Sequence, residues 1–453
     1  MNMAHAGVAA AALEKMAQAG ASPLAMRVFQ DYAAQISSGA TGLITEDSIE
    51  PLTSAVDAQS LEFSHEAQRT ALDQTVLLKL NGGLGTSMGM DHAKSLLPVR
   101  EGQTFLDLIS GQIRAARTRY GARLPLILMN SFRTREDSLA ALPQDIPLPD
   151  LPIDIVQGKE PKLLVDSLEP VSWPADPALE WCPPGHGDVY TTLADTGLVD
   201  ALLAQGYRYM FASNSDNLGA TPSGDLAAWF AASGAPFALE VCERTAADRK
   251  GGHLARRKSD GRVILREKAQ TAVEDEAYFA DEHRHRYFNT NNLWFNLEAL
   301  RDLLERTGGL VQLPLILNRK HVDPADPTSP EVYQVECAIG AIVDKFDGAQ
   351  AVLVPRSRFL PVKTTNDLLL IRSDAYRVND AYEFEQTEAQ LPLIDLDPRY
   401  FAMIADFNER FAQIPSLRGV TRLRVVGDLR FSGELAFSGD VELAGTGSVA
   451  AAS

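Results

Sequence analysis

Three glycines and a nearby lysine form the part of this chain that is best suited to binding phosphate. The segment Asn81-Gly82-Gly83-Leu84-Gly85 follows the apolar run Val76–Leu80, and Lys94 comes a few residues later. Glycines leave backbone N–H groups uncovered, so a phosphate can approach them without meeting a Cβ atom. A glycine loop at the carboxyl end of a strand therefore indicates a nucleotide site, and a simple tight turn is the alternative.

The spacing of these glycines excludes two common nucleotide motifs. A Walker A loop needs a lysine directly after its last glycine, and neither Gly85 nor Gly89 is followed by one. A dinucleotide fingerprint requires Gly-x-Gly-x-x-Gly, and the glycine that follows Gly83 and Gly85 comes one position too late. The loop is of another type, which the rest of the chain has to identify.

A histidine between two glycines is a second candidate for ligand binding. Gly185-His186-Gly187 follows the stiff pair Pro183-Pro184. The glycines leave the imidazole uncrowded and free to reach a ligand. The alternative is a histidine that makes only structural hydrogen bonds.

A single carboxylate follows an apolar strand farther along the chain. Asn214-Ser215-Asp216 comes directly after the run Tyr207–Ser213. One aspartate at a strand end suits Mg²⁺ that is held mainly by phosphate oxygens and water. The alternative is an Asx turn that closes the strand. A GT-A glycosyltransferase would normally show an Asp-x-Asp pair here, which this chain lacks.

Two further segments carry polar chemistry. The asparagines of Asn289-Thr290-Asn291-Asn292 lie around the expected start of the strand Leu293–Asn296, and amides suit a ligand with many hydroxyl groups. Arg356, Arg358 and Lys363 form a basic cluster stiffened by Pro361 in an otherwise acidic protein. A polar turn and a solvated charged face are the respective alternatives.

The elements that position these residues predict an α/β fold. Apolar, non-alternating strands interleave with helices such as Phe105–Arg119, which is typical of a mostly parallel sheet covered on both faces. Ligands of such sheets bind beyond the carboxyl ends of the strands. The expected strands are Val76–Leu80, Leu124–Met129, Tyr207–Ser213, Phe237–Val241, Leu293–Asn296 and Ala351–Val354. We expect an N-terminal helical region (1–70), a catalytic domain (71–380) and a C-terminal region (381–453).

Glycines recur every six residues near the C-terminus. Gly427, Gly433, Gly439 and Gly445 hold this period. A hexapeptide repeat predicts a parallel β-helix, in which three hexapeptides make one coil. About one coil is present, so its apolar face should lean on another part of the protein or on a second copy, which makes a homo-oligomer possible through this region. A hairpin with coincidental glycines is the alternative.

Composition restricts the partners and the location. A formal net charge of −18 and a pI near 4.9 argue against nucleic acid and against an acidic membrane surface. The three cysteines, Cys182, Cys242 and Cys337, have neither disulfide nor zinc spacing. With no basic leader and no apolar run of bilayer length, the protein is expected to be cytoplasmic.

These motifs together resemble a known family. LKLNGGLGTSMG, AKSLLPV, PPGHGD, SNSDNLGA, FNTNNLW and RFLPVKTTNDLLL occur in this order, and through them the chain resembles the UDPGP family of nucleotidyltransferases over roughly residues 70–380. The resemblance implies a Rossmann-like, GT-A-like sheet and a short C-terminal β-helix. It also implies Mg²⁺-assisted transfer of the uridylyl group of UTP to glucose 1-phosphate, which gives UDP-glucose and pyrophosphate. The asparagine in LNGGLGT favours glucose 1-phosphate over N-acetylhexosamine 1-phosphates.

The resemblance further implies roles for individual residues. Gln157 would pair with uracil, His186 would contact the sugar phosphate, and Asp216 would bind Mg²⁺. Lys94 and Lys363 would hold phosphates and act in catalysis. The nucleotide site would also include Leu80, Asn81, Gly82, Gly83, Gly185 and Asn214, and the sugar-phosphate site Asn214, Ser215, Asp216, Asn289 and Asn291.

Such a reaction needs positioning and charge neutralisation, because a phosphate is already a competent nucleophile. The sequence accordingly predicts direct displacement at the α-phosphorus without a covalent intermediate. Two alternatives stay open. One is a broader UDP-sugar pyrophosphorylase that also accepts galactose 1-phosphate, and the other is a non-catalytic nucleotide-sugar sensor.

Overall fold

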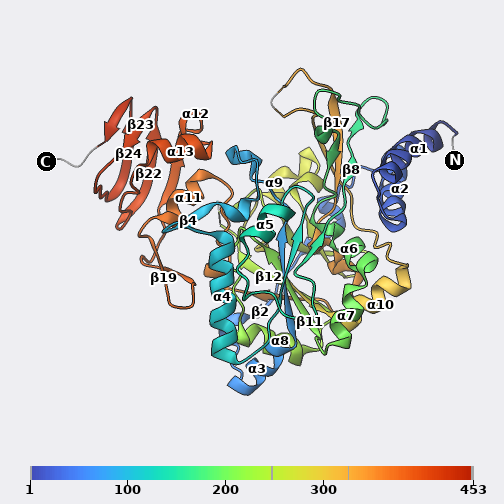
Figure 1. The fold of residues 1–453 in the computed structure, drawn as a ribbon, viewed down its shortest axis with the longest axis horizontal. Helices are drawn as coiled ribbons and strands as arrows, with labels where there is room; N and C mark the ends of the chain where they lie inside the picture. Colours follow the sequence, from blue (N-terminus) through green and yellow to red (C-terminus); the bar gives the residue numbers. More distant parts are fainter. Residues whose placement is uncertain (1–2, 246–247, 325, 450–453) are drawn as a thin grey trace.

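The central sheet of the molecule has a row of eight strands that is parallel apart from one strand, and three further strands, β1 (Ile49–Pro51), β13 (His253–Arg257) and β14 (Val263–Arg266), pair antiparallel beside it. The computed structural model describes residues 3–245, 248–324 and 326–449, and Figure 1 shows the sheet at its centre. Its order is β2 (Val56–Asp57), β18 (Gln350–Leu353), β12 (Phe237–Glu243), β15 (Tyr287–Asn296), β11 (Tyr209–Asn214), β3 (Thr75–Asn81), β6 (Leu126–Asn130) and β7 (Asp154–Val156). Only β15 along this order runs antiparallel to its neighbours. The predicted mostly parallel α/β sheet is confirmed.

Both faces of the sheet are buried, which explains the continuous apolar runs. Every residue of β3 is buried. Leu77 packs into the core on one face with α3 (His65–Asp73), α4 (Phe105–Tyr120), α8 (Gly224–Ser233) and α11 (Thr365–Arg372). Leu78 packs on the other face with α6 (Val189–Thr196), α7 (Leu198–Ala204) and α10 (Leu297–Thr307). Successive strand residues point to opposite faces, so a strand between two helix layers must be apolar throughout.

The helix expected over Phe105–Arg119 is observed as α4 with nearly the same bounds. Thr104 and Asp107 form a capping box at its start, and Gly121 ends it in the left-handed conformation with φ 64°. Other short elements surround the sheet. They are α5 (Arg135–Ala141), α9 (Glu276–Phe279), β4 (Pro98–Arg100), β5 (Gln103–Thr104), β8 (Glu160–Pro161), β9 (Leu163–Leu164), β10 (Trp181–Cys182), β16 (Ile316–His321), β17 (Glu331–Glu336), β19 (Tyr376–Val378) and β20 (Phe384–Gln386).

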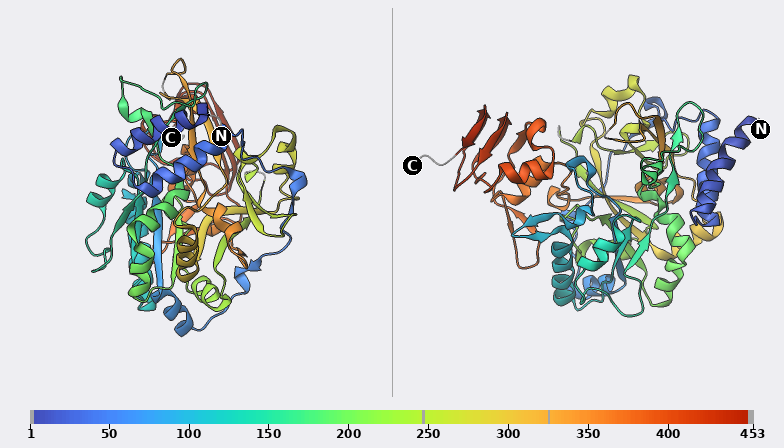
Figure 2. Two further views of the ribbon diagram at one scale, coloured as in Figure 1. Left: turned by 90° about the vertical axis from the view of Figure 1, so that its right-hand side faces the viewer. Right: turned by 45° about the horizontal axis from the view of Figure 1, so that its top comes forward.

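The N-terminal region is helical only in part. The helices α1 (Met3–Gln18) and α2 (Pro23–Ser37) pack against each other at one side of the molecule (Figures 1 and 2). Between α2 and α3, however, the chain supplies β2 to the central sheet and β1 (Ile49–Pro51) to β13 (His253–Arg257). Residues 49–57 therefore belong structurally to the sheet that carries the site.

The C-terminal region is built from parallel strand pairs at the opposite end of the molecule (Figure 2). Its elements are α12 (Pro398–Phe401), α13 (Ile404–Arg410), β21 (Leu393–Leu396), β22 (Val420–Val426), β23 (Leu429–Phe431), β24 (Gly439–Ala444) and β25 (Gly447–Val449). The pairs β21–β22, β22–β24 and β23–β25 are all parallel, which excludes the hairpin alternative. The region leans on α11, where Thr365 Oγ1 donates to the Phe401 carbonyl at 2.6 Å.

All three cysteines are buried and free. Across the described ranges, none of the helices is both long enough and apolar enough to cross a membrane.

Candidate active site

The glycine loop is shaped by a side chain that lies directly on it. A Cβ atom at position 82 would come within 2.5 Å of Gln157 Nε2, whereas a Cβ at position 83 would meet nothing within 4 Å. Gly82 is thus required for Gln157 to reach the loop, and Gly83 leaves room for a ligand. The backbone N–H of Ser215 donates to the Leu80 carbonyl at 3.1 Å and ties the loop to the end of β11.

The side chain of Asn81 supports this loop from below. It is buried, and its Nδ2 donates to Asn130 Oδ1 at 2.7 Å and to Ser138 Oγ at 2.8 Å. Both donors of its side-chain amide are therefore used within the protein. Sequence reasoning missed Asn130. The available signal was a second asparagine at the end of a predicted strand, since β3 and β6 end side by side with Asn81 opposite Asn130.

Lys94 and Asp216 form an ion pair across the centre of the site. Lys94 Nζ lies 2.6 Å from Asp216 Oδ2, and both side chains are mostly buried. The Lys94 backbone N–H also donates to the Gly83 carbonyl at 3.1 Å, so the lysine folds back over the glycine loop. Lys94, which is bonded to the glycine loop, and Asp216, which follows β11, thereby join these two parts of the site through one ion pair.

Asp216 is suited to a metal that takes most of its ligands from a substrate. Its second oxygen makes no hydrogen bond to the described residues, and among those residues no group of three or more acidic, histidine or cysteine side chains is arranged to hold a metal ion by itself. Mg²⁺ commonly binds through one or two carboxylates plus phosphate oxygens and water. One carboxylate beside a phosphate-binding loop fits that pattern.

The asparagine segment lies inside strand β15 and forms a β-bulge. Glu240 and Val241 are neighbours on β12, yet they face Asn292 and Asn289 on β15. The two extra residues of β15 include Asn291, which adopts a left-handed conformation with φ 61°. Its Nδ2 donates to the side chain of Asn214 at 2.9 Å. The strand expected to begin at residue 293 thus begins at residue 287, and the polar-turn alternative is wrong.

His186 is held as a neutral hydrogen-bond donor. Its Nδ1 accepts from the backbone N–H of Ile339 at 2.8 Å, which assigns the ring proton to Nε2. Burial lowers the pKa of His186 to about 4, so the ring is uncharged at neutral pH. A Cβ atom at Gly340 would lie 3.5 Å from Asn289 Nδ2. Residues 339–340 therefore bring His186 and Asn289 to the same place, and no sequence signal pointed to them.

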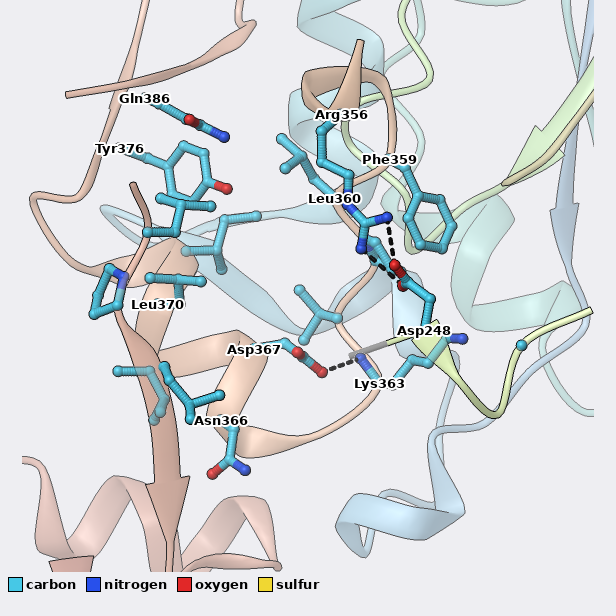
Figure 3. A pocket seen from close by; sticks show the side chains of 18 of the residues that line it. Asp248, Arg356, Phe359, Leu360, Lys363, Asn366, Asp367, Leu370, Tyr376 and Gln386 are labelled. Atoms are coloured by element: carbon cyan, nitrogen blue, oxygen red, sulfur yellow. Dashed lines mark hydrogen bonds and ion pairs between the residues drawn. The ribbon is translucent and has the colours of Figure 1, made fainter. Parts of the chain in front are cut away.

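The basic cluster separates into paired and unpaired cations. Arg356 donates to both oxygens of Asp248 at 2.7 and 2.8 Å (Figure 3), and Arg358 forms the same bidentate pair with Glu240. The Lys363 ammonium group makes no ion pair or hydrogen bond within the part of the chain that the structure describes. The solvated-face interpretation is wrong for both arginines, and Lys363 alone has its charge available.

Lys363 borders a cavity of about 500 Å³ that Figure 3 shows from close by. The backbone N–H of Lys363 donates to Asp367 Oδ2 at 2.9 Å at the start of α11. The preceding residue, Val362, donates its N–H to the Asp216 carbonyl at 3.3 Å. Lys363 is thus fixed beside Asp216, although 146 residues separate them in the sequence.

These features define a class of protein. The glycine loop, Lys94 and Asp216 converge at the carboxyl ends of β3 and β11, beside amide side chains from β15, and the backbone of the segment that carries Lys363 is bonded to Asp216. The single histidine among them uses one nitrogen to accept a backbone N–H and is not arranged as a general base. An arrangement of this kind neutralises and orients phosphates, as an α/β nucleotidyltransferase requires.

Comparison with known proteins identifies the family. The chain belongs to the UDPGP family, whose model is described as UTP–glucose-1-phosphate uridylyltransferase and matches residues 26–437. The UTP–glucose-1-phosphate uridylyltransferase of Musa acuminata is 40% identical over 365 residues, which cover 80% of this chain and 76% of that protein. The Saccharomyces cerevisiae enzyme of the same name is 40% identical over 357 residues, 78% of this chain and 70% of its own.

Solved structures agree over nearly the whole chain. A UDP-glucose phosphorylase from Trypanosoma brucei matches with a TM-score of 0.91 and 42% identity, covering 98% of this chain and 97% of its own. A mutant UDP-glucose pyrophosphorylase from Leishmania major in complex with UDP-Glc matches with a TM-score of 0.90 and 40% identity, covering 96% and 94%.

Proposed function

We propose that this chain is an enzyme that transfers the uridylyl group of UTP to glucose 1-phosphate, releasing UDP-glucose and pyrophosphate. Membership of the UDPGP family supports this assignment. The observation that carries it is the contact of Lys94 with Asp216, at the point where the glycine loop and the amides of β15 meet. A phosphate-binding half and a hydroxyl-binding half are thereby joined at one charged pair.

The nucleotide would occupy the side of the site formed by Gln157, the glycine loop and Gly185. Gln157 is buried against Gly82, and its carboxamide can both donate to and accept from the edge of uracil. The sugar phosphate would lie on the other side. There the Nε2–H of His186 can donate to a phosphate oxygen, and Asn289 and Asn291 can bind sugar hydroxyl groups.

Asp216 would hold Mg²⁺ together with the substrate phosphates, and the ion would supply positive charge to the reacting phosphates. Lys94 now occupies one oxygen of that carboxylate. Lys94 and Mg²⁺ would therefore share the carboxylate of Asp216. Phosphate oxygens of the bound substrates would give Lys94 a second anionic partner.

The chemical step would be attack by an oxygen of glucose 1-phosphate on the α-phosphorus of UTP. The new P–O bond forms as the bond to pyrophosphate breaks, so charge passes to the leaving group. Lys94 and Lys363 would stabilise that charge, and the backbone N–H groups of the loop would orient the phosphates.

The C-terminal strands support a short parallel β-helix. Arg422 of β22 pairs with Asp440 of β24, and 440 − 422 gives an offset of 18 residues, or three hexapeptides. We place the catalytic unit at residues 71–380, with residues 49–57 added to its sheet, and assign contacts between copies to the C-terminal region. The three free cysteines suit a reducing compartment such as the cytoplasm.

The direct test is turnover of the purified protein with a panel of sugar 1-phosphates and nucleoside triphosphates. We expect UDP-glucose and pyrophosphate from UTP and glucose 1-phosphate, with galactose 1-phosphate used much less efficiently. Equal use of both sugars would instead establish a broader UDP-sugar pyrophosphorylase. Binding of UDP-glucose without turnover would establish a sensor and refute the assignment as an enzyme.

A further inference from the structure

Asn217, next to the proposed metal ligand, has each hydrogen-bonding position of its side chain filled. It is only 1% exposed. Its Oδ1 accepts from the backbone N–H groups of Gly219 at 3.1 Å and Leu360 at 2.8 Å. Its Nδ2 donates to Asn292 Oδ1 at 3.1 Å and to the Arg358 carbonyl at 3.2 Å. A single amide thus connects the loop after β11, the segment before Lys363 and strand β15.

Glu240 makes a second set of connections in the same region. Its carboxylate is fully buried and accepts four hydrogen bonds. Arg358 donates two of them at 2.7 and 2.8 Å, and Asn292 Nδ2 and Trp294 Nε1 each donate one at 3.0 Å. The Glu240 carbonyl also accepts from Thr290 Oγ1 at 2.6 Å, inside the bulge. A buried charge is tolerated only when it is compensated in this way.

Together these two side chains touch the three segments that carry the proposed reacting groups. Asn217 follows Asp216 directly, and Asn292 follows Asn291. Leu360 lies with Lys363 beside the cavity (Figure 3), and Arg358 precedes them in the same segment. The backbone adds a bridge between Asn217 and Pro361, so the loop and the segment run side by side.

We propose that Asn217 and Glu240 are positioning residues, which fix the separation of Asp216, Lys363 and the β15 bulge without touching the substrates. The proposal rests on the function proposed above. Phosphoryl chemistry without a protein nucleophile depends on placement, and a misplacement of about 1 Å can reduce a rate about 100-fold. Hydrogen bonds have directional geometry, so a buried polar network can fix the relative positions of the three segments in a way that apolar packing does not.

A double-mutant cycle with Lys363 separates positioning from stability. Asn217→Asp keeps the shape of the side chain but replaces the donor with an oxygen that faces two acceptors. We expect kcat to fall roughly 10- to 100-fold, with KM for UTP changed less than about threefold. Because the variant acts partly through Lys363, its loss in a Lys363→Ala background should be at least fivefold smaller. If Asn217→Asp lowers kcat by nearly the same factor in the Lys363→Ala background as in the wild-type background, the proposal is overturned.

Glu46→Gln is the matched control. Glu46 is 5% exposed and is held by Arg266, Arg284 and His285, none of which lies in the three segments. This variant should lower the unfolding temperature and lose the same factor of activity in both backgrounds.

A second variant protects the test against misfolding. If Asn217→Asp does not fold, Arg358→Lys replaces it in the double-mutant cycle with Lys363→Ala. Lysine keeps the positive charge opposite Glu240 but cannot donate to both carboxylate oxygens in the bidentate geometry of arginine. Additive losses in an active enzyme would refute only the positioning role. A wild-type protein that does not turn over UTP and glucose 1-phosphate would refute the proposed function, and the positioning role with it.

Discussion

Replacement of Lys363 by alanine should mainly slow the chemical step. The lysine is exposed at the edge of the cavity, and its ammonium group makes no ion pair or hydrogen bond within the described residues, although its charge acts on Glu267. The backbone N–H of Val362, which donates to the Asp216 carbonyl, fixes its segment beside Asp216. Its charge is therefore available to bound phosphates. That charge matters most when the bond to pyrophosphate lengthens, so we expect kcat to fall more than KM for UTP rises.

The size of the effect follows from the setting of the charge. Removing one electrostatic contact to a transition state costs about 10²–10³ in rate, or about 2.7–4 kcal/mol. Lys363 is solvent-exposed, and exposed charges are weakened by screening, so the lower end, about 100-fold, is expected. Steady-state kinetics with UTP varied at saturating glucose 1-phosphate measures both constants.

The matched control for this substitution is Lys250→Ala. Lys250 lines the same cavity and is also exposed, whereas Arg358 is buried against Glu240 and would report on folding as well. Losses of similar size in Lys363→Ala and Lys250→Ala would mean that the cavity offers only a diffuse positive field. A Lys363→Ala variant within about twofold of wild type in both constants would refute the reasoning.

Three other substitutions and one deletion test the site and the tail. Gln157→Ala should narrow the preference for UTP over CTP by roughly 1–3 kcal/mol, the cost of an unmet buried polar group, and unchanged selectivity would remove it from the base pocket. Asp216→Asn should abolish turnover or raise the Mg²⁺ requirement, and full activity at low Mg²⁺ would leave only an Asx turn. Because burial lowers the pKa of His186 from 6.5 to about 4, the free energy of unfolding should fall as the pH drops through that window, and less so in His186→Gln. In chemical denaturation, an unchanged pH dependence of that variant would contradict the assignment. Deleting residues 420–453 should reduce stability or change the oligomer size in gel filtration, while equal stability and size would show that the tail is dispensable.

The parts of the fold and site that depend on local patterns could be predicted from the sequence. The apolar runs identified the parallel strands because both faces of the sheet are buried, and the glycines and Asp216 were expected where strands end. Both segments were expected in the ligand site because ligands of such sheets bind beyond the carboxyl ends of the strands. Lys94 followed from its distance to the glycine loop, and the structure places it 2.6 Å from Asp216.

Features that depend on contacts between distant segments could not be predicted. The bulge in β15 arises because the consecutive residues Glu240 and Val241 of β12 pair with Asn292 and Asn289 of β15, which leaves two residues of β15 unpaired between them. No local signal in β15 predicts that register. Ile339 is an ordinary apolar residue, and its contribution is the backbone N–H that donates to His186 Nδ1. Arg358 was grouped with the free cations because its partner, Glu240, is 118 residues away.

The antiparallel course of β15 has a consequence for how substrate preference could change. The nucleotide is expected to contact loops, which tolerate substitution and insertion. The amides proposed to bind the sugar belong to a strand between β12 and β11 and are set by the bulge against Glu240 and Val241, so their placement depends on the pairing of two strands. A new base could therefore be accepted through changes confined to loops, whereas a new sugar would require coordinated changes on β12 and β15. Directed evolution of this enzyme should alter its choice of nucleoside triphosphate more readily than its choice of sugar.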